Sequence, residues 1–245
     1  MVLPLFTKDF DALPTDGSIV VLDGAEGKHA ATVRRMRAGE GIQLTNGAGM
    51  RIVGEVVSAA EQRLEIRVST ATFEPKPTPE LILIQALAKG DRDELAIQAA
   101  TELGVAAVIP WQAERSISRW EGSKIAKGVE RWQTIVTEAA KQALRVYTPV
   151  VELPVTTKQL VGLVSNFTSV LVLDPTAVER LSQTELPGAG SVAIVVGPEG
   201  GINEHELSVL QQAGAVRVRL GKEILRTSTA GMAAIAALQG RLNRW

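Results

Sequence analysis

Two loops in the second half of the chain combine glycines with single charged residues. Residues 194–203 read IVVGPEGGIN, so Glu199 stands among three glycines directly after a run of branched apolar residues. Residues 219–238 read RLGKEILRTSTAGMAAIAAL, where Gly221 and Arg226 precede a helix rich in small residues. Glycines at the carboxyl end of a strand let a ligand lie against backbone amides, and open α/β sheets bind small molecules at that edge. Two such loops after neighbouring strands would form opposite walls of one pocket.

Neither loop matches a nucleotide-binding fingerprint. The glycine spacing is not G-x-G-x-x-G, and no G-K-[ST] follows to hold a phosphate. A nucleotide or phosphate hydrolase built on the same loops would normally add a cluster of metal-binding acids, and none is found. The chain has no cysteine and only two histidines, His29 and His205, which leaves little for a metal site or a histidine-based triad. We therefore expect no metal.

Composition predicts one large or two modest globular domains, because 45% of the 245 residues are hydrophobic and 22% are charged. The opening MVLPLFTKDF lacks a basic n-region, and no later stretch has the 18 or so apolar residues of a membrane span. We therefore expect no membrane segment and a cytoplasmic protein. With a net charge of −1, any RNA contact would come from local patches. VRRMR, with Arg34, Arg35 and Arg37, is such a patch, and a solvated basic turn is the alternative.

The composition changes at FEPKPTPE, residues 73–80, where three prolines predict a stiff linker between domains over 1–72 and 81–245. Before it, GIQLTNG and RLEIRV alternate apolar and polar residues, and Asn46-Gly47 signals a hairpin. This pattern predicts the antiparallel strands of a small barrel or sheet. After it, short apolar runs alternate with amphipathic segments, which predicts a mostly parallel sheet with helices on both faces.

Two helices are predicted to carry candidate site residues. A helix is predicted from a capping Asp91 to Gly104, with Leu95 and its neighbours at four-residue spacing on one stripe. The segment over 123–145 places Glu138, Gln142 and Arg145 on one polar stripe, which either lines a site or is a solvated face.

Two further helices are predicted to follow the two glycine loops. The first has Asn203 as its cap and Glu206 three residues later, and it ends before Gly214. Thr227 or Ser228 would cap the second.

GPEGG before an acidic helix start, and LGxxILRTxTA before an alanine-rich helix, resemble the RsmE-type ribosomal RNA methyltransferases of the SPOUT class. Five further stretches are similar to other blocks of that family: KGDRDELAIQAATELGV, AERS at 113–116, RW at 131–132, EAAKQALR and VRRMRAGEGIQLTNGAG. The resemblance implies an N-terminal PUA-like β-barrel over 1–72 and a C-terminal α/β domain with a trefoil knot. The chain departs from many members at Ser228 and at Ala143-Leu144.

The resemblance also implies an activity: S-adenosylmethionine-dependent methylation of N3 of a uridine in small-subunit (16S) rRNA, by a homodimer. The cofactor-binding residues that it implies are Leu173, Gly197, Glu199, Gly200, Gly201, Leu220, Gly221, Ile224, Leu225, Arg226 and Thr229. Uridine N3 must lose a proton, which calls for a base or for a cation that stabilises the anion.

Carboxylates and arginines are the candidates for that chemistry. Glu199 and Glu138 are candidate bases, although Glu199 could equally hold its loop by accepting amide hydrogen bonds. Arg226, Arg92 and Arg145 are candidate charge stabilisers or phosphate ligands, with ion pairing as the alternative for Arg226 and Arg92. The RNA-binding candidates are Arg34, Arg35, Arg37, Arg92 and Arg145. A non-catalytic RNA-binding protein would keep the basic patch but lose the cofactor loops, which this chain retains.

Overall fold

The computed structural model describes residues 2–245 and divides them into two units. The first unit ends at Lys76 and also includes Ala140–Thr148, and the second comprises Pro77–Ala139 and Pro149–Trp245. The boundary near Lys76 lies inside the proline-rich stretch. The sequence predicts one continuous domain over 81–245, whereas residues 140–148 fold with the first unit.

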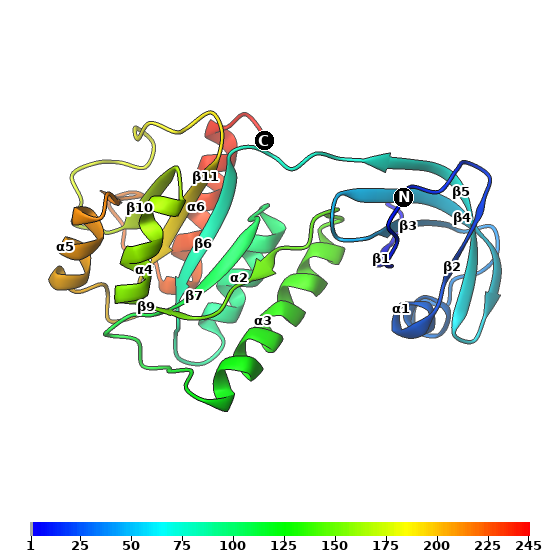
Figure 1. Ribbon diagram of the computed structural model, residues 1–245, viewed down its shortest axis with the longest axis horizontal. Helices are drawn as coiled ribbons and strands as arrows, with labels where there is room; N and C mark the ends of the chain where they lie inside the picture. Colours follow the sequence, from blue (N-terminus) through cyan, green and yellow to red (C-terminus); the bar gives the residue numbers. More distant parts are fainter. Residues whose placement is uncertain (1) are drawn as a thin grey trace. The chain divides into compact units, whose positions relative to one another are not determined.

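The first unit is built on a five-stranded sheet in the order β1-β3-β4-β5-β2, in which only the β1–β3 pair is parallel. Its elements are β1 (Leu5–Thr7), β2 (Ile19–Leu22), α1 (Gly24–Lys28), the π-helical turn η1 (His29–Val33), β3 (Gly41–Thr45), β4 (Met50–Ala60) and β5 (Arg63–Phe73). Within residues 2–245, the edge strands β1 and β2 do not pair with each other, so the sheet is curled but open (Figure 1). Of the predicted alternatives, a small barrel or a sheet, the open sheet is the one that forms, which corrects the β-barrel implied by the resemblance, since closure would require ladder hydrogen bonds between the two edges.

The predicted hairpin at Asn46-Gly47 is confirmed. β3 and β4 pair antiparallel, and the Asn46 side-chain carbonyl accepts hydrogen bonds from the amides of Ala48 (2.9 Å) and Met50 (3.1 Å). Gly47 has a φ of +70°, which a residue with a Cβ adopts only with strain. The predicted alternation is confirmed as well, because every second residue of Leu64–Val68 is buried in the core of this unit.

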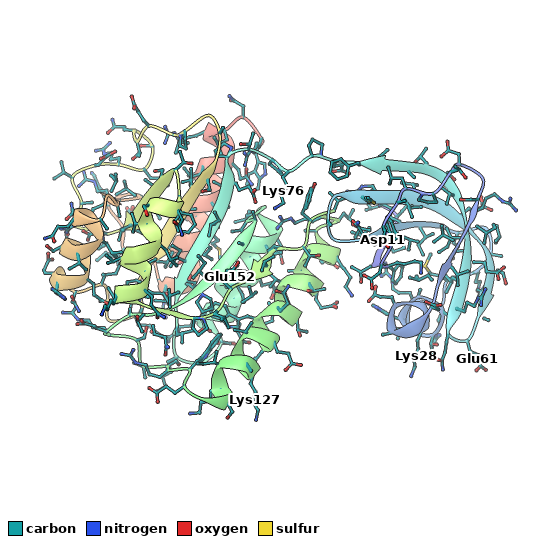
Figure 2. All side chains as sticks on the ribbon, viewed as in Figure 1. Asp11, Lys28, Glu61, Lys76, Lys127 and Glu152 are labelled. Atoms are coloured by element: carbon teal, nitrogen blue, oxygen red, sulfur yellow. The ribbon has the colours of Figure 1, made fainter. Side chains whose placement is uncertain are left out.

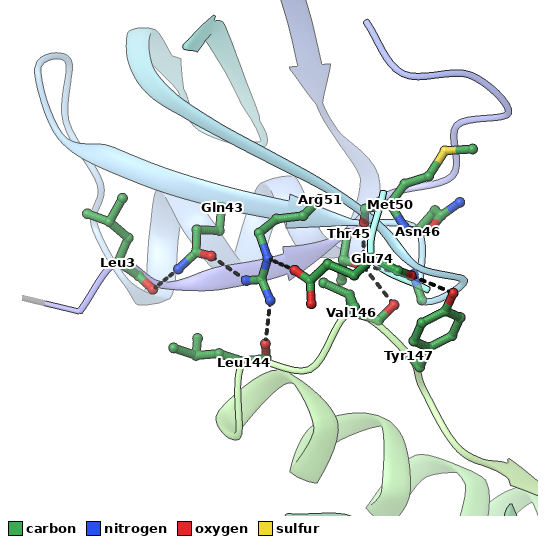
Figure 3. Close-up of polar contacts among 11 residues, drawn as sticks. Leu3, Gln43, Thr45, Asn46, Met50, Arg51, Glu74, Leu144, Val146 and Tyr147 are labelled. Carbon is green, nitrogen blue, oxygen red and sulfur yellow. Dashed lines mark hydrogen bonds and ion pairs between the residues drawn. The ribbon is translucent and has the colours of Figure 1, made fainter. Parts of the chain in front are cut away.

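Residues 140–148 complete the polar contacts at the β3–β4 end of the sheet (Figure 3). The amide of Gly49 donates to the carbonyl of Val146 over 3.0 Å, and the Arg51 guanidinium donates to the carbonyl of Leu144 over 3.0 Å. The side chain of Arg51 also donates to Gln43 and Glu74 (Figure 3). The segment therefore satisfies donors that the strands alone would leave unpaired.

The second unit is built on a seven-stranded sheet in the order β12-β10-β11-β6-β7-β8, with β9 beside β7, and all of its described pairings are parallel. Its strands are β6 (Glu80–Ala86), β7 (Ala107–Gln112), β8 (Val150–Val151), β9 (Val155–Thr156), β10 (Ser169–Leu173), β11 (Ser191–Val196) and β12 (Val216–Val218). Its helices are α2 (Arg92–Glu102), α3 (Ser123–Gln142), α4 (Thr157–Leu163), the 3₁₀ turn η2 (Val164–Asn166), α5 (Glu204–Gln212) and α6 (Thr227–Arg241). The last three residues of α3 belong to the first unit.

Helices cover both faces of this parallel sheet, as predicted (Figure 1). Alternate residues of β6 point to opposite faces: Leu81 and Leu83 belong to the core under α2, α3 and α6, and Ile82 and Ile84 to the core under α4 and α5. Both clusters consist of buried apolar side chains, so the sheet is packed on both faces beneath its loops. Because the strands are parallel, the loops that follow β6, β10, β11 and β12 share one edge.

The start of α2 differs from the prediction. Asp91 stands at the N-cap, but its side chain accepts no capping hydrogen bond. The carboxylate of Asp93, which is 5% exposed, instead accepts from the amides of Ala88 (3.1 Å) and Glu94 (2.9 Å). Leu95, predicted on the apolar stripe, is 51% exposed, because the helix buries the stripe that contains Asp93 and Ile97.

Candidate active site

The loops that follow β10, β11 and β12 surround a cavity of about 480 Å³, a volume within the usual range for small-molecule sites. Residues of all three loops line it, and Arg92 at the start of α2 joins them. Most of the residues predicted to bind a cofactor line this cavity: Leu173, Gly197, Glu199, Gly201, Leu220, Gly221, Ile224, Leu225 and Arg226. The two glycine loops are therefore brought together at one pocket.

Gly200 and Thr229 were predicted with that group but are not among the residues that line the cavity. A Cβ on Gly200 would lie 3.3 Å from the Cβ of Arg115, whose guanidinium donates to the Gly200 carbonyl over 3.0 Å. The hydroxyl of Thr229 donates to the carbonyl of Arg226 over 3.1 Å. Both residues support the loops rather than form the pocket wall.

The glycines that line the cavity do so for different reasons. Gly201 has a φ of +70°, and a Cβ there would meet no atom within 4 Å. At Gly221 a Cβ would approach only the carboxylate of Glu223, at 3.4 Å. At Gly197, in contrast, it would lie 2.6 Å from Cγ1 of Ile202, so this glycine allows the loop to fold on itself. Gly201 and Gly221 thus leave open space beside the cavity.

The carboxylate of Glu199 ties the first glycine loop to the start of α2. One oxygen accepts from the amide of Lys89 and from the guanidinium of Arg92, each over 3.0 Å. Burial of the carboxyl acts to raise the pKa of Glu199, but hydrogen bonds from two backbone amides and from Arg92 outweigh it, so the pKa lies below its ordinary value. A carboxylate with a lowered pKa holds protons weakly, which suits an anchor better than a base.

Arg226 stands at the N-cap of α6, where it is exposed at the wall of the cavity. Within residues 2–245, its guanidinium has no ion pair or hydrogen bond. Arg92, by comparison, is engaged by Glu199. Of these two predicted arginines, Arg226 is the one whose charge is available to a ligand.

Asp174, directly after β10, also lines the cavity and was not singled out from the sequence. Burial acts to raise the pKa of this carboxyl, but hydrogen bonds from Thr176 and the guanidinium of Arg217 outweigh it and the pKa is lowered. The arginine reaches it from β12, so the pair ties two neighbouring strand ends together. An aspartate directly after a buried strand, in SVLVLD, was the available signal.

Glu138 is not part of this cavity. It lies exposed on α3, where it lines a separate surface hollow of about 600 Å³ with Gln133 and Leu153. The two cavities share no lining residue. Within the second unit, the structure therefore does not bring Glu138 to the glycine loops.

The remaining predicted RNA-binding residues lie in the first unit. Arg145 is half-buried, and burial lowers the pKa of its guanidinium to about 10. Arg34, Arg35 and Arg37 are exposed on the bend that follows η1, while Met36 between them is 6% exposed and anchors the bend in the core. Figure 2 shows Lys28 projecting from α1 in the same unit. The three arginines thus present their charge outward from a fixed turn.

Residues 2–245 contain neither a candidate metal site nor a candidate membrane span. No group of three or more His, Cys, Asp or Glu side chains there could hold a metal ion. No helix in the same residues is both long and apolar enough to cross a membrane.

Two protein-family models match the sequence of this chain. The RNA methyltransferase domain model matches residues 74–239, and the RNA methyltransferase PUA domain model matches residues 22–69. The chain belongs to the RNA methyltransferase family whose curated members are called ribosomal RNA small subunit methyltransferase E.

Individual relatives match over almost the whole chain. The protein of that name from Mycobacterium bovis is 43% identical over 96% of this chain and 91% of the relative. The one from Bacillus subtilis is 34% identical over 89% and 88%. The crystal structure of the Neisseria gonorrhoeae protein of that name, bound to S-adenosyl methionine, is 31% identical and covers 98% of both chains with a TM-score of 0.86.

Proposed function

We propose that the protein transfers a methyl group from S-adenosylmethionine to N3 of a uridine in small-subunit (16S) rRNA, in the cytoplasm. The family supports rRNA methylation, and the likeness to a cofactor-bound structure supports this cofactor. The uridine and its N3 position follow from the resemblance of the sequence. The observation that carries the proposal is the cavity between the two glycine loops, with the guanidinium of Arg226 at its wall.

The residues of the cavity fit a nucleoside-type cofactor. Gly201 and Gly221 leave their backbone open to it, and apolar side chains such as Leu173 and Leu220 line it. Bound S-adenosylmethionine would supply an activated methyl group, so the chain has only to position the two reactants and manage charge. The backbone of the two loops would hold the adenosine part.

Within this site, Arg226 has the catalytic role in the proposal. A positive charge beside the uracil ring would lower the cost of passing the N3 proton to solvent water, because the resulting anion is paired, and the N3 lone pair could then take the methyl group. Glu199 serves as an anchor that keeps Arg92 and the glycine loop in place. Arg92 and Arg145 then remain candidates for phosphate contacts, and Arg34, Arg35 and Arg37 for positioning the rRNA from the first unit.

The proposal includes a trefoil knot in the second unit. Its support is the contact between the end of α6 and the long connection from β10 to β11. The guanidinium of Arg241 donates to the carbonyls of Leu181 (2.7 Å) and Thr184 (2.6 Å) in that connection. The end of the chain is therefore fastened to a loop that the knot would require it to pass through.

The proposal also includes a homodimer. Its support is the composition of α6, in which Ala234 is buried while Ala230 and Ala233 are only partly covered. Small side chains let a second helix approach closely.

The test is methyl transfer to small ribosomal subunits with methyl-labelled S-adenosylmethionine, followed by nucleoside analysis. We expect labelled 3-methyluridine and no other labelled nucleoside. Arg226→Ala should lower the single-turnover rate about 10²–10³-fold with little change in cofactor affinity, and Arg226→Lys should restore only part of it. A different labelled nucleoside would contradict the proposed substrate atom, and a near-normal rate in Arg226→Ala would contradict the role of that residue.

A further inference from the structure

We propose that Gln85 is a positioning residue that holds the two walls of the cavity together through the hydroxyl of Thr227. This inference rests on the proposed function, because it assigns a role in binding the cofactor and in placing Arg226. Gln85 lies on β6, is 0% exposed and is not among the residues that line the cavity. Its effect on catalysis would therefore be indirect.

Two hydrogen bonds in series form the link. The amide nitrogen Nε2 of Gln85 lies 2.9 Å from Oγ1 of Thr227, and that Oγ1 lies 2.8 Å from the carbonyl oxygen of Gly197. Gly197 begins the first glycine loop, and Thr227 is the first residue of α6, directly after Arg226. Both line the cavity. One buried side chain of the central strand is thus connected to both walls.

The direction of these bonds is fixed by the chemistry of the three groups. A carbonyl oxygen only accepts, so the single proton of the Thr227 hydroxyl must point to Gly197. The hydroxyl oxygen must then accept its second bond, and the donor that reaches it is the amide nitrogen of Gln85. A carboxylate in the place of this amide would have no proton to donate. The link therefore requires a neutral donor at residue 85.

The side-chain oxygen of Gln85 shows that an amide at this position destabilises the fold. Its carbonyl oxygen Oε1 is buried without a hydrogen-bond partner within residues 2–245. A buried polar atom without a partner costs free energy, and an apolar side chain would avoid that cost. The neighbours Leu83 and Ile84 on the same strand are apolar and fully buried. The donor function of Gln85 explains why this core position holds an amide.

The consequence for the site is geometric. If the link is broken, the Gly197 carbonyl loses its donor, and the first turn of α6 loses its tether to β6. The guanidinium of Arg226 then moves relative to the first glycine loop. We therefore expect both weaker cofactor binding and a slower step at saturating cofactor.

The experiment compares paired variants of the full-length protein. Thr227→Val removes the hydroxyl at nearly constant volume, and Thr227→Ser keeps it. We expect the dissociation constant for S-adenosylmethionine to rise about tenfold in Thr227→Val and to stay near the wild-type value in Thr227→Ser, because both hydrogen bonds of the hydroxyl, worth about 0.5–1.5 kcal/mol each, are lost in the first variant only. The single-turnover rate at saturating cofactor should fall in the same variant. Equal behaviour of the two variants would overturn the inference.

A second pair tests the donor at residue 85. Gln85→Met has no donor at any pH, so its affinity for S-adenosylmethionine should be lower than that of the wild type by the same factor at every pH. In Gln85→Glu the new carboxyl is buried, which raises its pKa. Its protonated form can donate to Thr227, so we expect the affinity of this variant to recover relative to wild type as the pH falls from 8 to 6. A pH-independent deficit equal to that of Gln85→Met, or wild-type affinity in both, would overturn the inference.

Failure of the inference is distinguishable from failure of the proposed function. Wild-type protein that binds no S-adenosylmethionine would contradict the function itself. Wild-type binding together with unaffected Gln85→Met and Thr227→Val would contradict only the link. Thermal melts of each variant establish that a lower affinity belongs to folded protein. If either substitution at residue 85 prevents folding, the two Thr227 variants still decide the outcome.

Discussion

Removing the carboxylate of Glu199 distinguishes an anchor from a base. The carboxylate accepts one backbone amide of Lys89 and one guanidinium N–H of Arg92, each over 3.0 Å. The Arg92 and Glu199 side chains are 44% and 21% exposed, so solvent screens the ion pair and its contribution is at most about 1 kcal/mol. The amide hydrogen bond to a charged acceptor adds about 1.5 kcal/mol.

These values predict graded losses of cofactor affinity. Glu199→Ala removes both interactions, which together hold the loop by about 2 kcal/mol, so the dissociation constant for S-adenosylmethionine should rise ~30-fold. Glu199→Gln keeps an acceptor for Lys89 and loses only the charge, so a rise of about fivefold is expected. Both variants should react at close to the wild-type rate once the cofactor is saturating, because an anchor acts on binding.

Calorimetric titration gives the affinities, and single-turnover methylation at saturating cofactor gives the rates. Glu204→Gln is the matched control, since Glu204 also lines the cavity, is 84% exposed and lies 3.8 Å from its nearest cation, Arg217. We expect little change in this control. The reasoning would be refuted if Glu199→Gln bound the cofactor normally but reacted about 10² times more slowly or worse, which is the signature of a lost general base.

Three further predictions concern the pocket, its pH dependence and the RNA. Gly221→Val should fold, because only the Glu223 carboxylate lies near the added atoms, and should weaken cofactor binding by about 1–3 kcal/mol, because the new side chain takes up space beside the cavity. An unchanged affinity by calorimetry would place the cofactor elsewhere. Because the pKa of Asp174 is lowered in the folded protein, the carboxylate stabilises the fold fully above about pH 4, and this contribution is lost as the pH falls below that value. The melting temperature of Asp174→Asn should therefore fall less steeply with decreasing pH than that of the wild type, and equal slopes would contradict this. Replacing the arginines of residues 34–37 by alanine should reduce the salt dependence of RNA binding by up to about three phosphate contacts, with cofactor affinity unchanged; equal slopes would exclude this patch.

Features of the fold that depend on neighbouring residues were predictable from the sequence. The hairpin at Asn46-Gly47 forms because the amide side chain and the glycine act within four residues. Helix α5 begins at the predicted Asn203, with the capping box to Glu206 present. The open edge of the first sheet was not predictable, because alternation along a strand gives its two faces but not which strands pair.

The candidate site was likewise predictable only where its features depend on neighbouring residues. Glycines after buried strands predicted the two loops and the cavity between them. The contact of Gly200 with Arg115 joins residues that are 85 apart in the chain, so no local pattern shows it. Thr227 was predicted as a possible cap of α6, but its hydroxyl donates to Gly197 instead. A glycine or hydroxyl in a loop thus indicates special geometry without showing its partner.

The segment Ala140–Thr148 has a consequence for the order in which the chain can fold during synthesis. The strands of the first sheet are complete once residue 73 has been made, yet Gly49 and Arg51 find their partners at Val146 and Leu144. A ribosome adds these residues about 70 positions later, several seconds afterwards at ordinary rates of 5–20 residues per second. Gly49 and Arg51 therefore lack these partners until Pro77–Ala139, the first 63 of the 160 residues of the second unit, have been made.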